Sequence, residues 1–200
     1  MTARPRSDEK AQAIIDAARR CLSEKGYVAT TIAEIAASAG VSRGLLHYYF
    51  ESKEELLAQV VRAGTDAYME LVEAMFAQSE SAEDLAKGLV GAARALFESD
   101  PTFVNLTMEC WTLAHESPLV ARELEDLYRQ FRDAICEGLE EAVGRGIIEP
   151  AIPLEGLAAL LLAITDGLVM QFLIHPELAA DERMWEALEL AARALVGHRV

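Results

Sequence analysis

The chain has 200 residues, of which 52% are apolar and 26% are charged. This length gives one large domain or two small ones with a real core, and the composition excludes a disordered or low-complexity chain. The three cysteines, Cys21, Cys110 and Cys136, form neither a disulfide framework nor the paired spacing of a zinc site. No apolar stretch near the start precedes a cleavage site, so we expect a cytoplasmic protein.

The net charge of −15 is unevenly distributed along the chain. Residues 1–53 carry eight basic and six acidic residues, a balance of +2, whereas residues 54–200 carry 10 basic and 27 acidic residues, a balance of −17. We therefore expect two domains with different partners, 1–53 and 54–200. The acidic part repels DNA, so any contact with nucleic acid belongs to the first part.

Apolar residues recur at spacings of three and four almost throughout, and no run alternates as a strand would. The first expected helix ends at Gly26. Thr31 and Glu34 form a capping box that begins a second helix, which Gly40 ends. Ser42 caps a short third helix.

The later helices are expected to be longer. The fourth to seventh run from Ser52 to about Gln78, from Ser81 or Ala82 to Asp100, over 102–115, and from Ser117 to Gly144. The eighth follows the connector Ile147–Pro153, and the ninth runs from Asp181 to near Gly197. The fold class is therefore all-α, with about nine helices: a small N-terminal domain of three helices and a larger helical domain.

The segment Gly156–Ile174 is the most membrane-like in the chain, but it contains Asp166 and Gln171. A charged group at a bilayer centre costs about 2.5–3.5 kcal/mol on insertion scales. We interpret the segment as a core or interface helix and expect no membrane partner.

The second and third expected helices meet through a very short turn at Gly40, the geometry of a helix-turn-helix. Leu46, Tyr49 and Phe50 share the inward face of the third helix. The outward face carries Arg43, Gly44, His47 and Tyr48, a set that suits the major groove of DNA. An ordinary helical hairpin with a solvated face remains an alternative.

Residues 27–56 resemble the DNA-binding domain of the TetR family of transcriptional regulators. The motifs that carry the resemblance are Thr30-Thr31, Ile32-Ala33 with Ile35-Ala36, Gly40-Val41-Ser42, Leu46-His47-Tyr48-Tyr49-Phe50 and Ser52-Lys53. The rest of the chain is similar only in kind, with a weaker resemblance to the BetI-type branch around Phe103–His115 and 160–171.

The resemblance implies roles for individual residues. Ser42, Arg43, Gly44 and Leu45 match the groove-facing start of the recognition helix. Thr31 and Lys53 match positions that contact phosphates. Because arginine can donate two hydrogen bonds to a guanine edge, Arg43 is the first candidate for a base contact.

His47 departs from the family, which commonly has a phosphate-binding tyrosine there. Either its imidazole donates to a phosphate, which makes operator affinity depend on pH near 6.5, or it is a plain spacer. The leader Thr2–Ser7, with Arg4 and Arg6 around Pro5, either reaches a minor groove or is idle.

The TetR-like architecture implies a pocket for a small, largely apolar effector in the second domain. The candidate lining residues are Tyr68, Phe103, Asn105, Met108, Glu109, Trp111, His115, Tyr128, Phe131 and Gln171. Plain core packing is the alternative for each of them. Asp166 is interpreted as a helix-interface acid paired to the backbone or to Thr165. No cofactor and no metal are expected.

The last two helices are expected to form the homodimer interface, a four-helix bundle across a two-fold axis. The residues assigned to it are Leu157, Leu161, Ile164, Leu168, Phe172, Met184, Leu188, Ala192 and Leu195. A dimer also places two recognition helices about 34–36 Å apart, which fits successive major grooves of a palindrome.

The leading hypothesis is a regulator of transcription, a repressor that a small-molecule effector releases from a palindromic operator on double-stranded DNA. An all-α enzyme is the rival, but the chain has no metal-binding His motif, no nucleophile elbow and no phosphate-binding glycine loop. A helical ligand-binding or adaptor module without DNA-binding activity is the other alternative.

Overall fold

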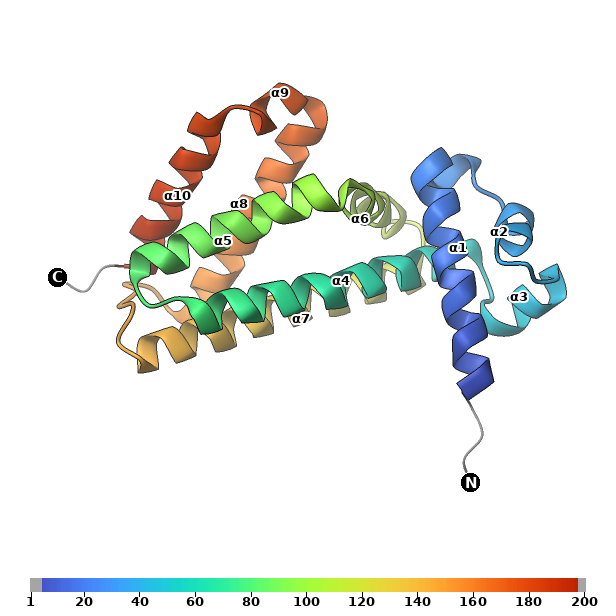
Figure 1. Ribbon diagram of the computed structural model, residues 1–200, viewed down its shortest axis with the longest axis horizontal. Coiled ribbons are helices and arrows are strands. Elements are labelled where there is room, and N and C mark those ends of the chain that lie inside the picture. The colour runs from blue at the N-terminus through green and yellow to red at the C-terminus, as the bar shows by residue number, and fades with distance from the viewer. Residues whose placement is uncertain (1–4, 198–200) are drawn as a thin grey trace. The chain divides into compact units, whose positions relative to one another are not determined.

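A computed structural model describes residues 5–197 of the chain, and α-helices with short connections make up this part (Figure 1). Side chains are described from Glu9 onwards, with the exception of Ala67. The helices are α1 (Pro5–Ala29), α2 (Ile32–Ser38), α3 (Arg43–Tyr49), α4 (Lys53–Gln78), α5 (Ala82–Ser99), α6 (Pro101–Leu113), α7 (Pro118–Gly144), α8 (Leu154–Ile174), α9 (Pro176–Ala179) and α10 (Glu182–Val196). The all-α fold class is confirmed.

Two details differ from the expectation. Ten helices rather than nine occupy the described residues, because α9 forms a single turn directly after α8. Four residues are too few to show a helical period in the sequence. The first helix also continues beyond Gly26, whose φ of 74° and ψ of 171° kink it before a last turn that ends at Ala29. A glycine adopts this conformation without the steric cost that a Cβ would bring.

Most of the expected helix starts are confirmed by their caps. The hydroxyls of Ser42 and Ser81 accept hydrogen bonds from the backbone amides of Leu45 and Asp84, and Asp181 caps α10 in the same manner. Such caps stabilise a helix start because its first backbone N–H groups have no partner inside the helix.

The described chain divides into two compact units. One contains α1–α3, α4 as far as Thr65, α6, and α7 as far as Leu127; the other contains residues 66–100 and 128 onwards. This division differs from the expected boundary after residue 53, because α4 is one unbroken helix across that position and α6 packs against α1. Charge alone could not reveal either fact.

The first unit has a core to which α1, α2, α3 and α4 each contribute a residue without exposed surface. Ile14, Ile35, Leu46 and Leu57 have no exposed surface. On its surface the guanidinium of Arg62 in α4 donates to Glu123 in α7.

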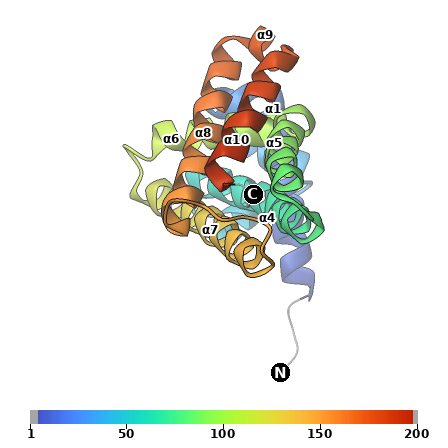
Figure 2. The ribbon, with the colours of Figure 1, turned by 90° about the vertical axis from the view of Figure 1, so that its left-hand side faces the viewer.

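The larger core cluster of the second unit is formed by α4, α5, α7 and α8, with Phe76, Leu85, Leu139 and Leu157 buried in it. Its helix α10 contacts both α5 and α8; Figure 2 shows these three helices next to one another. Phe172, Trp185 and Ala192 pack here with residues of α5. Arg94 of α5 donates two hydrogen bonds of 2.8 Å to Glu182 and lies 5.4 Å from the centre of the Trp185 ring.

Four of the residues assigned to the dimer interface lie on the buried sides of α8 and α10. Leu157, Leu161, Phe172 and Ala192 are between 0% and 8% exposed, because they pack in the core of their own unit. The remaining expected residues, Ile164, Leu168, Met184, Leu188 and Leu195, are partly buried. A helix that is apolar on most sides does not reveal from its sequence which side faces its own subunit.

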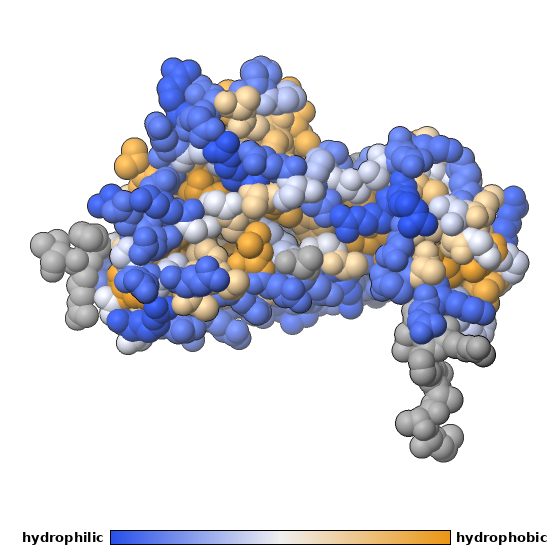
Figure 3. All heavy atoms as spheres, viewed as in Figure 1, coloured by the Kyte–Doolittle hydropathy of each residue, from blue (hydrophilic) through white to orange (hydrophobic). Residues whose placement is uncertain are grey.

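The side of α8 that its own unit leaves open is also apolar. Leu160, Met170, Leu173 and Ile174 are 38–72% exposed, and so is Leu190 of α10 at 67%. We call these five residues the α8–α10 apolar face. Figure 3 shows apolar atoms gathered over the part of α8 nearest α9. By length and composition α8 could cross a membrane, and 22% of its most apolar stretch is buried.

Gly138 provides a test of how tightly the second unit is packed. A Cβ at this position of α7 would lie 2.4 Å from the ring of Phe76, whereas a Cβ at the exposed Gly91 of α5 would meet nothing. We expect Gly138→Ala to lower the free energy of unfolding by about 1–3 kcal/mol, because the buried ring must move. The control Gly91→Ala should raise it by about 0.5–1 kcal/mol, since alanine favours the helix. Urea unfolding measures both, and equal effects would contradict this packing.

Candidate nucleic-acid interface

The turn between α2 and α3 fixes the angle at which α3 is presented. Gly40 has a φ of 67°, and the amide of Val41 donates to the carbonyl of Ala36 at 3.0 Å, which closes the end of α2. Helices often end in this way: a glycine in the left-handed conformation lets the amides that follow donate to the last carbonyls of the helix. Ser42 then caps α3 two residues further on. The turn therefore has little freedom.

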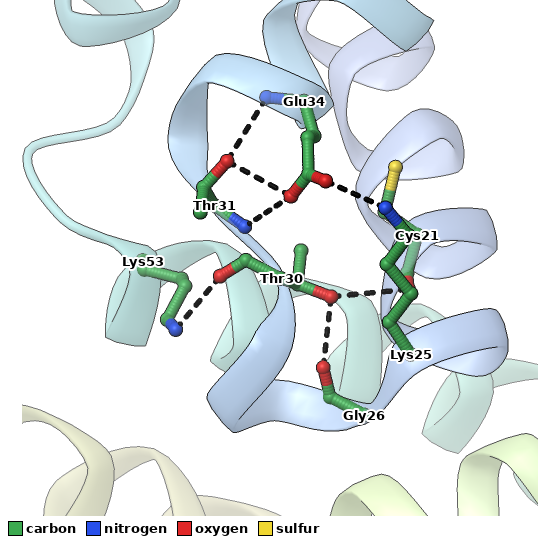
Figure 4. A network of polar contacts seen from close by, with 7 residues as sticks. All are labelled: Cys21, Lys25, Gly26, Thr30, Thr31, Glu34 and Lys53. Carbon is green, nitrogen blue, oxygen red and sulfur yellow. Dashed lines mark hydrogen bonds and ion pairs between the residues drawn. The ribbon is translucent and has the colours of Figure 1, made fainter.

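The start of α2 is held as firmly (Figure 4). The carboxylate of Glu34 accepts from the amide and the hydroxyl of Thr31, both at 2.9 Å, and its own amide donates back to that hydroxyl at 3.3 Å. Lys25 of α1 pairs with the same carboxylate at 2.5 Å. This ammonium and the bonds from Thr31 lower the pKa of Glu34 to about 2. The capping box is confirmed, and it also ties α2 to α1.

The outward face of α3 is as the sequence predicts. Leu46 and Phe50 point into the core, at 0% and 6% exposure, and the small Ala36 of α2 is buried. Ser42, Arg43, Gly44, His47 and Tyr48 are exposed, and Leu45 is partly buried. Tyr48 is 78% exposed, which is unusual for a large aromatic side chain. A chemically varied set of side chains therefore projects from a rigid, short helix.

Thr31 and Lys53 have roles inside the protein that the sequence does not reveal. The ammonium of Lys53 donates to the carbonyls of Tyr27 at 2.7 Å and Thr30 at 2.9 Å, and it lies 4.1 Å from the centre of the Tyr27 ring. Both polar hydrogens of Thr31 are directed to Glu34. A lysine ammonium has three donors, so one of the three N–H groups of Lys53 remains for a phosphate.

Arg4 lies outside the described residues, and so does the side chain of Arg6.

The structure places the ten candidate effector residues in both units. Asn105, Met108 and Glu109 border a groove in the first unit, whereas Tyr68 and Phe131 stack edge to face in the second. Phe103 is buried; Trp111, His115 and Gln171 are exposed. Trp111 is 38% exposed, so one side of α6 is open in its own unit.

Asp166 has a different partner from the one expected. The hydroxyl of Tyr128 in α7 donates to its carboxylate, whereas Thr165 donates to the carbonyl of Leu161 on its own helix. Burial raises the pKa of Asp166, and the bond from Tyr128 opposes that shift. Burial, with the nearby charge of Asp166, also raises the pKa of Tyr68 to about 12. The pair could not be read from the sequence, because its members lie on different helices.

Comparison with known proteins agrees with this geometry. Residues 14–60 match the family of bacterial regulatory proteins named tetR, and residues 82–197 match the C-terminal domain of BetI-type transcriptional repressors. The HTH-type transcriptional regulator TtgR of Pseudomonas putida is 28% identical over 199 residues, covering 90% of this chain and 91% of its relative.

Two solved structures share the fold. Salmonella enterica GusR superposes with a TM-score of 0.76 at 23% identity, over 94% of this chain and 95% of the other. The regulator FadR from Bacillus subtilis, solved in complex with stearoyl-CoA, superposes with a TM-score of 0.71 at 18% identity, over 92% and 96%.

A capped helix-turn-helix with an exposed recognition face, joined to a larger helical domain, defines the class of helix-turn-helix transcriptional regulators. The chain belongs to the TetR family, and its C-terminal domain is of the BetI type. The resemblance seen in residues 27–56 and the weaker one in the second domain are both confirmed.

The contacts of Lys53 lead to a prediction about stability. Lys53→Met keeps the apolar stem over the Tyr27 ring but removes the charged donor from two carbonyls. We expect the free energy of unfolding to fall by about 1–3 kcal/mol. The control Lys87→Met removes an exposed lysine paired with Glu83 and should change it by less than about 0.5 kcal/mol. Equal effects of the two substitutions in urea would show that Lys53 does not hold the end of α1.

Proposed function

We propose that the protein is a repressor that binds a palindromic operator as a homodimer and leaves it when a small, largely apolar effector binds. The observation that carries the proposal is the exposed face of α3, with Arg43, Gly44, His47 and Tyr48 on a helix held by caps at both ends of the turn. An arginine beside a glycine allows close approach to a base edge. Within 1–53 the balance of charge is positive, whereas the rest of the chain repels DNA.

Three sets of residues have distinct roles in this proposal. Ser42, Arg43, Gly44 and Leu45 read the major groove, with Arg43 donating to a guanine. Thr31, His47, Tyr48 and Lys53 position the domain on phosphates. For Lys53 this contact uses the remaining N–H group; for Thr31 the phosphate replaces the Glu34 carboxylate.

The homodimer is supported by the α8–α10 apolar face. Large apolar side chains exposed on α8 and α10 indicate an interaction site, because monomeric proteins rarely leave large apolar patches open to water. The two-fold symmetry of a dimer brings the same face of α8 and α10 together in both subunits, which forms a four-helix bundle. Two recognition helices then read the two halves of a palindrome.

Release follows from a shift between two conformations. The effector binds the second domain, and α4, which begins beside the helix-turn-helix at Lys53 and ends at Gln78, passes the change to the first. An effector shifts the equilibrium only by the difference between its affinities for the two states. A largely apolar effector agrees with the acyl-CoA ligand of FadR. We place this regulator in the cytoplasm, where both effector and operator occur.

The decisive test compares the native protein with Arg43→Ala in the selection of genomic fragments at moderate salt. We expect the native protein to recover a palindromic site and Arg43→Ala to lose about 1–3 kcal/mol of specific binding, because a bidentate base contact is lost. Arg132→Ala, which removes an exposed arginine of α7, is the control with unchanged affinity.

Recovery of the same fragments with native protein and Arg43→Ala would refute the placement of the recognition helix. Recovery of no fragment, from protein that mass analysis shows to be free of ligand, would favour a helical module without DNA-binding activity.

The dimer is tested by placing charge on the α8–α10 apolar face. Leu160→Glu should convert the dimer to a monomer in analytical ultracentrifugation, because a carboxylate would be buried without a partner in the interface. Val28→Glu, at a residue 86% exposed in the other unit, is the control that stays dimeric. A dimer that survives Leu160→Glu with unchanged affinity would place the interface elsewhere.

A further inference from the structure

A groove of about 480 Å³ lies between the end of α1 and the outer side of α6, within the first unit. This volume is within the range of about 300–1,000 Å³ that is typical of small-molecule sites. Its lining residues are Leu22, Ser23, Gly26, Thr102, Asn105, Leu106, Met108, Glu109 and Thr112. The sequence indicated three of them as ligand candidates but gave no sign that α1 forms the opposite wall.

The groove combines an apolar floor with a polar border. Leu22 and Leu106 are each 2% exposed, so their side chains form a fixed base. The hydroxyls of Ser23 in α1 and Thr102 in α6 lie 2.8 Å apart and link the two walls. Asn105 in α6 is exposed and has a carboxamide that can both donate and accept. A ligand with an apolar body and a polar group fits such a site better than a hydrocarbon does.

The electrostatics of the groove are one-sided. Glu109 is the one charged residue among those that line it, and no lysine, arginine or histidine is present among the lining residues. Its negative charge affects buried neighbours. Burial is the main cause that raises the pKa of Cys110 to about 12, and the carboxylate of Glu109 is the second cause. Burial, the bond to Glu54 and the charge of Glu109 together raise the pKa of Tyr27. A cationic ligand is favoured here, and an anionic one is repelled.

We propose that this groove binds a small organic cation, with its ammonium group at Glu109 and its apolar body over Leu22 and Leu106. The groove lies in the first unit, whereas the candidate effector residues Tyr68 and Phe131 lie in the second. A ligand seated here touches α1 and α6 at once, so it favours the arrangement of these two helices that binds it more tightly. The inference rests on the groove and not on the proposed function.

The test uses tryptamine as the probe, with its neutral and anionic analogues tryptophol and indole-3-acetate as matched comparisons. In protein with 13C-methyl methionine, the signal of Met108 is assigned through Met108→Leu. We expect tryptamine to shift this signal saturably and to leave Met75 and Met184 of the second unit unshifted. Tryptophol should bind about fivefold more weakly, because it lacks the charge, and indole-3-acetate should not bind.

Three variants separate the site from general binding. Glu109→Gln should weaken tryptamine about fivefold, to the level of tryptophol, whereas Glu116→Gln, at an exposed residue just beyond α6, should leave it unchanged. Asn105→Phe fills the groove from an exposed position and should abolish the shift. No saturable shift at Met108, equal binding of the three probes, or unchanged binding in Glu109→Gln would each overturn the proposal.

The outcome is independent of operator binding. The experiment contains no DNA, and Arg43→Ala should bind tryptamine as the native protein does. Failure of the groove therefore leaves the regulator proposal intact, and failure of operator binding leaves the groove intact.

Discussion

The geometry of the DNA-binding domain depends on how the end of α1 is closed. Gly26 breaks the regular helix, which leaves carbonyl groups near the kink in need of donors. The hydroxyl of Thr30, 1% exposed, shares its proton between the carbonyls of Cys21 and Gly26 at 3.0 and 2.8 Å. Lys53 supplies the carbonyls of Tyr27 and Thr30 from the first turn of α4. A single cluster thus connects the helix before the helix-turn-helix with the helix after it.

The same cluster connects the Thr-Thr pair at 30–31 with the Ser-Lys pair at 52–53, which lie far apart in the sequence. The Thr-Thr pair at 30–31 divides its work: Thr30 closes α1, and Thr31 opens α2 through Glu34. The Ser-Lys pair at 52–53 does likewise, because Ser52 accepts from the amide of Glu55 while Lys53 reaches back to α1. These pairs therefore have a structural purpose that does not require DNA, so their presence in a chain indicates an intact domain before it indicates a bound phosphate.

The sequence predicted local features well and distant pairings poorly. The caps at Thr31, Ser42 and Asp181 depend on residues within one turn, so the chain itself shows them. The inward position of Leu46 follows from helical spacing. By contrast, the bond between Tyr128 and Asp166 joins helices far apart in the chain, and the groove at Glu109 needs α1 as its second wall. Helical periodicity contains no information on which helices become neighbours.

The apolar helix α8 is a second case in which helical periodicity does not show which residues become buried. Its sequence is apolar on most of its circumference, so periodicity could not distinguish the side buried at Leu157 from the side open at Ile174. A helix of this composition on the surface of a monomer would promote aggregation unless a partner covered it. The 27 acidic residues of 54–200 oppose association without specificity, because like charges on two copies repel. The proposed dimer satisfies both constraints, because a second copy related by two-fold symmetry covers the apolar side with one interface while the charged surfaces stay in water.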